Sequence, residues 1–583
     1  MRALLDFTSI EDVRYGKDPV SDAWLLHFMT ANHLENFMDP IKNASPEQLR
    51  FMVALDANQV FAPCSDWLFK RLVTPGLAAD LLQQYINVWK TLVKLVRTHV
   101  SDKYQRRLIL NLCRHKFKQA LDASILIPWR LLKGMITIFL SRSGLDDPYR
   151  NRKSILVSRG RAYLESDFFK RSMESCPYPP LECSCLEDMR FELDMIELER
   201  LFRLSTLPDT WSADLFSEDF SRYSSCFSKD KVDFTGMRDI FCKNRSGLKI
   251  LYLPDDSGGL PSDLLMVKSL LRQGHSVIMA LKEGFCFDCP TIWDNGNDPA
   301  LTEILKGAYF ITESRISKNE LLDTLRKNPF VIISDGTRER LNLIRCSVTF
   351  SRAWKESDLI LAKGWANRRR LIKNTHQFTR DVMCFHRNRN GRFKLEFKAK
   401  SHRTHKFSEL DITAKADEII SEMQQARSER KAVMFYSGIV GSIPGQVDVA
   451  ISLLKTFVSD LRSRLEDTYI INPAEHFVEG MDADDLMFMW EKVQRSGLIS
   501  IWRFQTYADI ERSFELMDKK VPNVWVGKDA TYSTGCTKER YIAKDVQRQH
   551  RELQILGPGP DRFLRRREYG VGRFSDVVIE PSN

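Results

Sequence analysis

Apolar side chains in roughly the first 240 residues recur at intervals of three and four, the spacing of one helix face. The stretch LAADLLQQYINVWKTLVKLVRTHV, residues 77–100, is the clearest case. Strand-type alternation is scarce here, and segments 141–154 and 174–185 carry the Gly, Pro and charged residues typical of breaks between helices. The pattern predicts a helical N-terminal domain over residues 1–240.

From about residue 246 the pattern changes to short apolar runs that alternate with helical segments. Each run ends in Pro, Asp, Ser or Gly. The runs lie in GLKILYLPDD (247–256), VIMALKEGF (277–285), KNPFVIISDGT (327–337), SDLILAKGWAN (357–367) and GRFKLEFKAKS (391–401). Strands that alternate with helices predict a mostly parallel, Rossmann-like sheet in a three-layer α/β domain, which we place at residues 245–425.

A second alternating segment follows and predicts a C-terminal α/β unit over residues 430–583, whose role the sequence leaves open. AVMFYSGIVGSIPGQ (432–446) predicts a strand and a Gly-rich loop. NVWVGKDATYSTGC (523–536) predicts a further strand and loop. The predicted fold class is therefore α/β, with a helical N-terminal domain, a mostly parallel α/β domain and a second α/β unit.

Composition restricts the class of protein. The chain has 583 residues, 43% hydrophobic and 28% charged, which suits two to four globular domains. A net charge of +10 fits anionic ligands such as phosphates, and we expect no nucleic-acid partner. Arg130, Lys133 and Pro128 interrupt the most apolar stretch, 123–140, so we expect a buried helix and no membrane span. The N-terminus lacks the apolar core of a signal peptide, and we expect a cytoplasmic protein with reduced thiols.

Four polar turns, PDDSGG, FDCP, SDGT and KGWAN, follow predicted strands. Ligands of open parallel sheets bind beyond the carboxyl ends of the strands, so these turns can converge on one site. Hard divalent cations take carboxylate oxygens as ligands, which makes Asp255, Asp256 and Asp288 candidate metal ligands. The alternative is that Asp255 and Asp256 form a turn and cap the following helix.

The other two turns carry groups suited to phosphate. Lys363 stands at a strand end, where an ammonium group can bind a phosphoryl oxygen, and Asn367 can donate to the same group. Ser334 supplies a hydroxyl beside free backbone N–H groups. The alternative is that KGWAN and SDGT are ordinary turns between elements.

Taken in chain order, ILYLPDDSGGLPSDLLMVKSLL, FCFDCP, VIISDGT and SDLILAKGWANRRRLI resemble the damage-control phosphatase family, metal-dependent enzymes that include acidic-residue methyltransferase-like proteins. The resemblance covers about residues 245–400. The family has a helical N-terminal part beside an α/β domain, with Asp-Asn-x-Gly-Glu after its first strand and Lys-Gly-x-x-Asn after a later one. Matched by position, the corresponding residues are Asp255, Asp263 in the following helix, Asp288, Lys363, Gly364 and Asn367.

The resemblance implies a metal-dependent phosphatase that hydrolyses a phosphomonoester of a small metabolite, with Mn²⁺, Co²⁺, Ni²⁺ or Mg²⁺ as cofactor. It implies Asp255, Asp256 and Asp288 as metal ligands. Asp256, Asp288 and Lys363 would be the catalytic residues. Ser334, Lys363, Gly364 and Asn367 would bind the phosphate.

Two departures from the family pattern leave other functions open. Asp256 stands where the family has Asn, and Gly259 stands where it usually has Glu. The alternative function is therefore a non-catalytic protein that binds a metal or a phosphorylated metabolite. A methyltransferase is a third class, but no Gly-x-Gly-x-Gly strand end supports it.

Several other residues are weaker candidates. Cys286 and Cys289 form a lone C-x-x-C, a weak zinc or redox signal. Cys536, close to a predicted helix start, is a candidate for a lowered thiol pKa, with a buried or capping role as the alternative. Glu475 and His476 follow a predicted strand, and arginines 565–567 suit a solvated face or an anion contact.

Overall fold

The computed structural model describes most of the chain. The described residues are 9–34, 46–56, 58–176, 180–207, 232–243, 247–296, 299–388, 390–404, 406–443, 445–476 and 480–564. The arginines at 565–567 lie outside them. The chain divides into two compact units, Met1–Arg403 and Thr404–Asn583.

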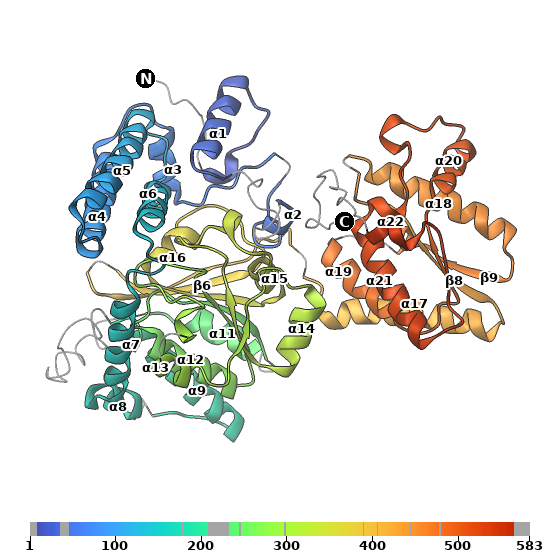
Figure 1. Ribbon diagram of the computed structural model, residues 1–583. Coiled ribbons are helices and arrows are strands. Elements are labelled where there is room, and N and C mark those ends of the chain that lie inside the picture. The colour runs from blue at the N-terminus through green and yellow to red at the C-terminus, as the bar shows by residue number, and fades with distance from the viewer. Residues whose placement is uncertain are drawn as a thin grey trace. The chain divides into compact units, whose positions relative to one another are not determined.

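Helices account for the structure of the first unit before its first strand, as the apolar periodicity predicts. They are α1 (Pro19–Ala31), α2 (Pro46–Leu49), α3 (Asp66–Val73), α4 (Ala79–His99), α5 (Lys103–Ala123), α6 (Pro128–Ser143), α7 (Arg150–Glu165), α8 (Asp167–Glu174), α9 (Leu186–Leu204) and α11 (Thr235–Lys243). Helix α4 buries Leu81, Tyr85, Val88 and Leu92, which lie on one face because they are three or four residues apart. Figure 1 shows α4, α5 and α6 side by side, and α6 is the buried helix expected in 123–140.

A seven-stranded sheet forms the centre of this unit, in the order β3-β4-β2-β1-β5-β6-β7. The strands are β1 (Lys249–Leu253), β2 (Ser276–Leu281), β3 (Tyr309–Ile311), β4 (Phe330–Ser334), β5 (Leu359–Lys363), β6 (Asp381–Arg387) and β7 (Phe393–Lys398). All neighbouring pairs are parallel except β6 and β7, which are antiparallel. The helices after β1 are α12 (Leu260–Arg272), α13 (Pro299–Ile304), α14 (Lys318–Lys327), α15 (Val348–Glu356) and α16 (Gly364–Leu371). The mostly parallel sheet predicted from the sequence is confirmed.

The strand order places a topological switch point between β1 and β5. The chain runs from β1 to β2 on one side, and later returns to β5 on the other side of β1. Loops that leave two such strands in opposite directions open a crevice at the carboxyl edge of the sheet. Asp255 and Gly364 follow the two strands that flank this crevice.

Helices α7 and α9 pack on the sheet through one hydrophobic core, and α4 and α6 pack on it through another. The buried members of this second core include Leu92 from α4, Phe139 from α6, Ile278 from β2 and Ile360 from β5. The structure therefore places the helices of residues 1–240 in the same compact unit as the sheet. It also places helix α17 (Glu409–Ser428), which we assign from sequence to the 245–425 domain, in the second unit.

His376 connects the N-terminal region to the end of the sheet domain. Its ring is fully buried, Nε2 accepts a hydrogen bond from the backbone N–H of Ala62 at 3.1 Å, and the ring packs on Phe61. Burial, together with the charge of Lys398, lowers the pKa of His376 from 6.5 to about 3. The neutral imidazole is thus the form that this contact requires.

We expect this histidine to make the protein sensitive to acid. Between pH 6.5 and 3 the unfolded state binds a proton that the folded state excludes, so folding stability falls as the pH falls. The slope from this single group is about 1.4 kcal/mol per pH unit. Urea unfolding of His376→Gln at pH 7, 6 and 5 should give a correspondingly flatter pH dependence. Replacement of the exposed His27 with Gln is the control, and equal slopes in all three proteins would contradict the assignment.

The second unit contains a four-stranded parallel sheet in the order β11-β10-β8-β9. Its elements are α17, β8 (Ala432–Ser437), α18 (Val447–Arg464), β9 (Thr468–Ile471), α19 (Ala483–Gln494), β10 (Ile501–Phe504), α20 (Tyr507–Leu516), α21 (Thr534–Gln549), β11 (Gln554–Leu556) and α22 (Pro560–Leu564). The strand predicted within 523–536 is wrong. Short 3₁₀ turns at Asn523–Trp525 and Ala530–Tyr532 occupy that segment, because Trp525 alone enters the core while Val524 and Val526 remain exposed.

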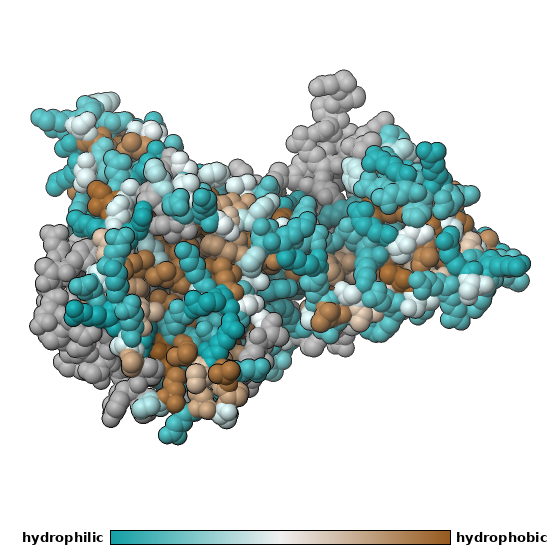
Figure 2. Space-filling model, turned by 90° about the horizontal axis from the view of Figure 1, so that it is seen from below, coloured by the Kyte–Doolittle hydropathy of each residue, from teal (hydrophilic) through white to brown (hydrophobic). Residues whose placement is uncertain are grey.

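None of the described helices combines the length and the apolar character needed to cross a bilayer. Large exposed apolar side chains occur on separate elements, among them Leu26, Ile155 and Leu410. Figure 2 shows hydrophilic and hydrophobic residues interspersed over one face of the molecule. Single apolar residues of this kind are normal on a protein surface.

Candidate functional site

The close approach of the two loops at the switch point requires a glycine at position 364. Gly364 has φ +91°, a conformation that residues with a Cβ rarely adopt. A Cβ built there would lie 1.9 Å from Oδ2 of Asp255. The first residue of α16 therefore fits closely against the Asp255 carboxylate. Because it has no Cβ, the glycine of KGWAN leaves room for that carboxylate in the crevice.

A buried ion pair lies beneath these loops. The Nζ atom of Lys363, at the end of β5, is 2.7 Å from Oδ1 of Asp263 in the first turn of α12. The side chains of Lys363 and Asp263 are only 3% and 0% exposed. Burial raises the pKa of Asp263 to about 6, although Lys363 acts in the opposite direction. Lys363 thus lies close to the predicted site, with its charge directed to Asp263.

Asp255 and Asp256 carry negative charge that is only partly balanced. Both side chains are partly exposed and surrounded by protein. Burial and the charge of Asp256 raise the pKa of Asp255 to about 7, against the opposite effects of Lys363 and Arg340. Burial also raises the pKa of Asp256, whose Oδ1 accepts a hydrogen bond from the Gly259 N–H at 2.9 Å. This pair of crowded carboxylates would favour a cation.

Asp288 reaches the same neighbourhood from the loop after β2. Its backbone oxygen accepts a hydrogen bond from the Ser257 N–H at 2.7 Å, and its charge contributes to the raised pKa of Asp256. Its carboxylate, however, forms an ion pair with Arg152 of α7, with Nε and Oδ1 2.6 Å apart. These side chains are 59% and 31% exposed, and surface pairs of this kind contribute about 0–1 kcal/mol. A second hydrogen bond from Nη2 of Arg152 to Oδ2 at 3.2 Å makes the pair bidentate, so the Asp288 carboxylate is directed to Arg152.

The donor set is suited to a hard divalent cation. No group of three or more His, Cys, Asp and Glu side chains within the described residues is arranged so that it could hold a metal ion. Mg²⁺ and similar ions nevertheless bind commonly through one or two carboxylates, with water and phosphate oxygens as further ligands. Asp255 and Asp256 provide that minimum, and Asp288 is a third carboxylate nearby.

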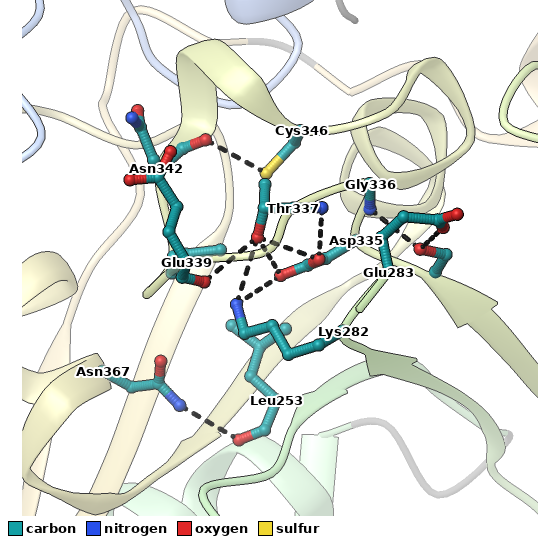
Figure 3. Close-up of polar contacts among 12 residues, drawn as sticks. Leu253, Lys282, Glu283, Asp335, Gly336, Thr337, Glu339, Asn342, Cys346 and Asn367 are labelled. Atoms are coloured by element: carbon teal, nitrogen blue, oxygen red, sulfur yellow. Dashed lines mark hydrogen bonds and ion pairs between the residues drawn. The ribbon is translucent and has the colours of Figure 1, made fainter. Parts of the chain in front are cut away.

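Asn367 supports the turn between β5 and α16. Its Nδ2 donates to the backbone oxygen of Leu253 at 3.3 Å (Figure 3). It also donates to the backbone oxygen of Lys363 at 2.8 Å, and so bridges the ends of β1 and β5. Its side chain is 9% exposed. The amide predicted to bind phosphate is thus engaged with the backbone at the switch point, where it holds the two strand ends together.

Ser334, at the end of β4, belongs to a neighbouring polar network. Its hydroxyl donates to Glu283 and accepts from the Gly336 N–H at 3.0 Å. Lys282, which follows β2, forms an ion pair with the buried Asp335 at 2.5 Å (Figure 3). Lys282 and Asp335 neutralise each other. This ion pair therefore adds no net negative charge beside Asp255.

Three groups beside the site were not predicted from the sequence: Arg152, Lys282 and Arg340. Lys282 is visible in the sequence as the first residue after an apolar strand, the same signal that identifies Lys363. Arg152 and Arg340 have no such signal. Arg152 comes from a helix 136 residues before its partner, and only the fold brings the two together.

The remaining cysteine and strand-end candidates have structural contacts. Cys286 and Cys289 are hydrogen-bonded to each other, and that contact lowers the pKa of Cys286 and raises that of Cys289. Cys536 is buried, and burial raises its pKa well above the usual value, which agrees with the buried role and not with a lowered thiol pKa. Glu475 forms an ion pair with Arg462 at 2.8 Å.

No protein-family profile and no curated protein matches this sequence. Among solved structures, the chain is similar to a DUF89 family protein from Pyrococcus horikoshii. The match has 18% sequence identity and a TM-score of 0.36, and it covers 52% of this chain and 90% of that chain.

Proposed function

We propose that this protein is a metal-dependent phosphatase that hydrolyses a phosphomonoester of a small metabolite in the cytoplasm. The observation that carries the proposal is the partly exposed pair Asp255 and Asp256 at the switch point. Burial and the charge of Asp256 raise the pKa of Asp255 to about 7, and the pair lies beside a buried lysine. The resemblance of these residues to the damage-control phosphatases supplies the reaction class.

Each residue has a role in this proposal. Asp255 and Asp256 hold the divalent cation, and Asp288 joins them by leaving its exposed pair with Arg152. A cation held by these residues would supply Lewis acidity and would make water more acidic there. Lys363 provides positive charge beneath the phosphoryl group, Gly364 leaves room for the Asp255 carboxylate beside that group, and Asn367 maintains the turn. Ser334 presents its hydroxyl at the neighbouring strand end.

A non-catalytic binding protein is the second candidate, and one observation favours it. Lys363 is already paired with Asp263 and is 3% exposed, so its ammonium group is less available to a developing charge than a free lysine would be. Gly259, in place of the usual Glu of the resembled family, also removes one polar group from the loop. Both features are compatible with ligand binding without turnover.

The experiment that separates the two is a turnover assay with metal add-back. The full chain is stripped of metal with a chelator and tested against a panel of sugar and polyol phosphates with Mn²⁺, Co²⁺, Ni²⁺ or Mg²⁺. Phosphate release that depends on added metal supports the enzyme. Binding of metal or of a phosphate ester by calorimetry, without release from any ester, supports the binding protein, and binding of neither would overturn both.

A further inference from the structure

The positive charge of this protein is concentrated in three of its N-terminal helices. Residues 79–143, which contain α4, α5 and α6, include twelve Lys and Arg, three Asp and no Glu, a net charge of +9. The whole chain has a net charge of +10, so the rest of it is almost neutral. A charge asymmetry of this size within one chain indicates a surface for an anionic partner.

Most of these charges lie at the surface without a carboxylate beside them. The exposed basic residues are Lys90, Lys94, Arg97, Lys103, Arg107, Arg114, Lys118 and Arg142. Within the described part of the chain, none of these eight forms an ion pair. Asp80 pairs instead with Arg71 of α3 at 2.9 Å, and Asp102 accepts a hydrogen bond from the Gln105 N–H at 2.6 Å as the N-cap of α5. The positive charge is therefore not cancelled where it lies.

Helix α5 arranges four of the exposed basic residues along one face. They are Lys103, Arg107, Arg114 and Lys118. Their spacings of four, seven and four residues correspond to whole turns of a helix, so the side chains lie above one another. The other side of α5 is buried through Ile109, Cys113 and Ala120. Figure 1 shows α5, together with α4, along the outer edge of the first unit.

An exposed apolar stripe runs beside this basic stripe on α5. Tyr104, Leu108 and Leu112 are four residues apart and are 77%, 37% and 38% exposed. Tyr104 directly follows Lys103, and Leu108 directly follows Arg107, so each lies about 100° around the helix from a basic residue. Lys and Arg beside Leu and an aromatic residue are typical of helices that lie in the surface of an anionic bilayer.

We propose that this face of α5, with the positive charge of α4 beside it, binds the surface of an anionic lipid membrane. The basic groups contact lipid phosphates and carboxylates, while Tyr104 and Leu108 enter the boundary between head groups and acyl chains. A nucleic acid would engage the basic stripe alone and leave the apolar stripe in water, so the pairing of the two stripes favours lipid. The contact is peripheral and does not depend on the proposed phosphatase activity.

The test is co-sedimentation of the full chain with large vesicles of phosphatidylcholine, with or without about 30% phosphatidylserine. Each Lys or Arg near an anionic surface contributes about fivefold to binding, so we expect at least about 100-fold stronger binding to the anionic vesicles. Salt at about 0.5 M should weaken it. Arg107→Gln combined with Arg114→Gln should lower binding at least about tenfold. The matched control is Arg161→Gln combined with Lys170→Gln, which removes the same charge from exposed positions on α7 and α8.

The apolar stripe has a test of its own. Tyr104→Ser should lower binding to the anionic vesicles about threefold or more, because the ring no longer leaves water. Equal losses in the two double variants would overturn the inference, since only net charge would then matter. It would also be overturned if the natural chain ignored the anionic vesicles, including the case in which polyuridylate RNA or polyglutamate bound through Arg107 and Arg114 instead.

Discussion

Asp255→Asn will stabilise the metal-free protein and at the same time abolish metal-dependent hydrolysis. Asparagine keeps the shape of the side chain that fits against Gly364, but it removes one of two adjacent negative charges. The pKa of Asp255 is raised to about 7, so at pH 8 the folded state bears the cost of an ionised carboxylate that the unfolded state does not. We expect a gain of about 1 kcal/mol or more in the free energy of unfolding.

The sign of the stability change follows from linkage. A carboxyl whose folded pKa exceeds its unfolded value of 3.8 stabilises the fold below pH 3.8 and loses that contribution as the pH rises through 7. The gain in Asp255→Asn should therefore grow between pH 4 and pH 7 and then level off. Chemical unfolding in a chelating buffer at several pH values measures it.

The activity change has a different cause. Loss of a carboxylate ligand removes the charge that holds the cation, and we expect kcat/KM to fall by a factor of at least about 100. The control is Asp56→Asn, because Asp56 is exposed and its pKa is lowered by Arg403 and Arg14. That variant should show no gain in stability and full activity. A less stable Asp255→Asn protein, or one that retains turnover, would contradict the assignment of Asp255.

Most of the sheet could be predicted because its central strands are short, apolar and bounded by turn residues. Strands β1, β4 and β5 are buried almost throughout, which gives continuous apolar runs in the sequence. Strand β3 gives no such signal, because it has three residues and its first, Tyr309, is 48% exposed. Strand β6 begins with Asp381 and ends with Arg387, and these charged ends obscure its apolar centre.

The site could be predicted only to the level of the loops that form it. Strand ends identify Asp255 and Lys363 as neighbours, because parallel strands bring their carboxyl ends to one edge. The ion-pair partner of each side chain could not be predicted in this way. Lys363 pairs with Asp263, 100 residues away, and Asp288 pairs with Arg152, 136 residues away. No local pattern encodes such pairs, because they depend on how α7 and α12 pack.

The surroundings of two arginines in α16 could not be predicted from the sequence either. Arg369 and Arg370 follow KGWAN in an evident basic run, for which a solvated helix face is the ordinary interpretation. The N-terminal helices α3, α4 and α6 cover that face and convert it into the wall of a pocket.

Lys363→Met will destabilise the protein by about 3–5 kcal/mol, the usual cost of leaving a buried charge without its partner. The side chains of Lys363 and Asp263 are 3% and 0% exposed, so water cannot replace the lost ammonium group at Asp263. Asp255 and Asp256 lose the same nearby cation, because Lys363 opposes the rise in the pKa of both. Urea unfolding at pH 7.5 in chelating buffer measures the effect. Lys415→Met is the matched control, since Lys415 pairs with Glu418 on the surface and should cost less than about 1 kcal/mol.

A double-mutant cycle shows whether the loss comes from the pair itself. If the buried charge on Asp263 causes the cost, Asp263→Asn removes that charge and should restore part of the stability in the Lys363→Met background. The coupling free energy should be about 2–3 kcal/mol, at the upper end for residues in contact. Additive effects would mean that Lys363 acts through packing alone. In that case its ammonium group would be available to a phosphoryl oxygen, and the argument for a non-catalytic binding protein would lose its main support.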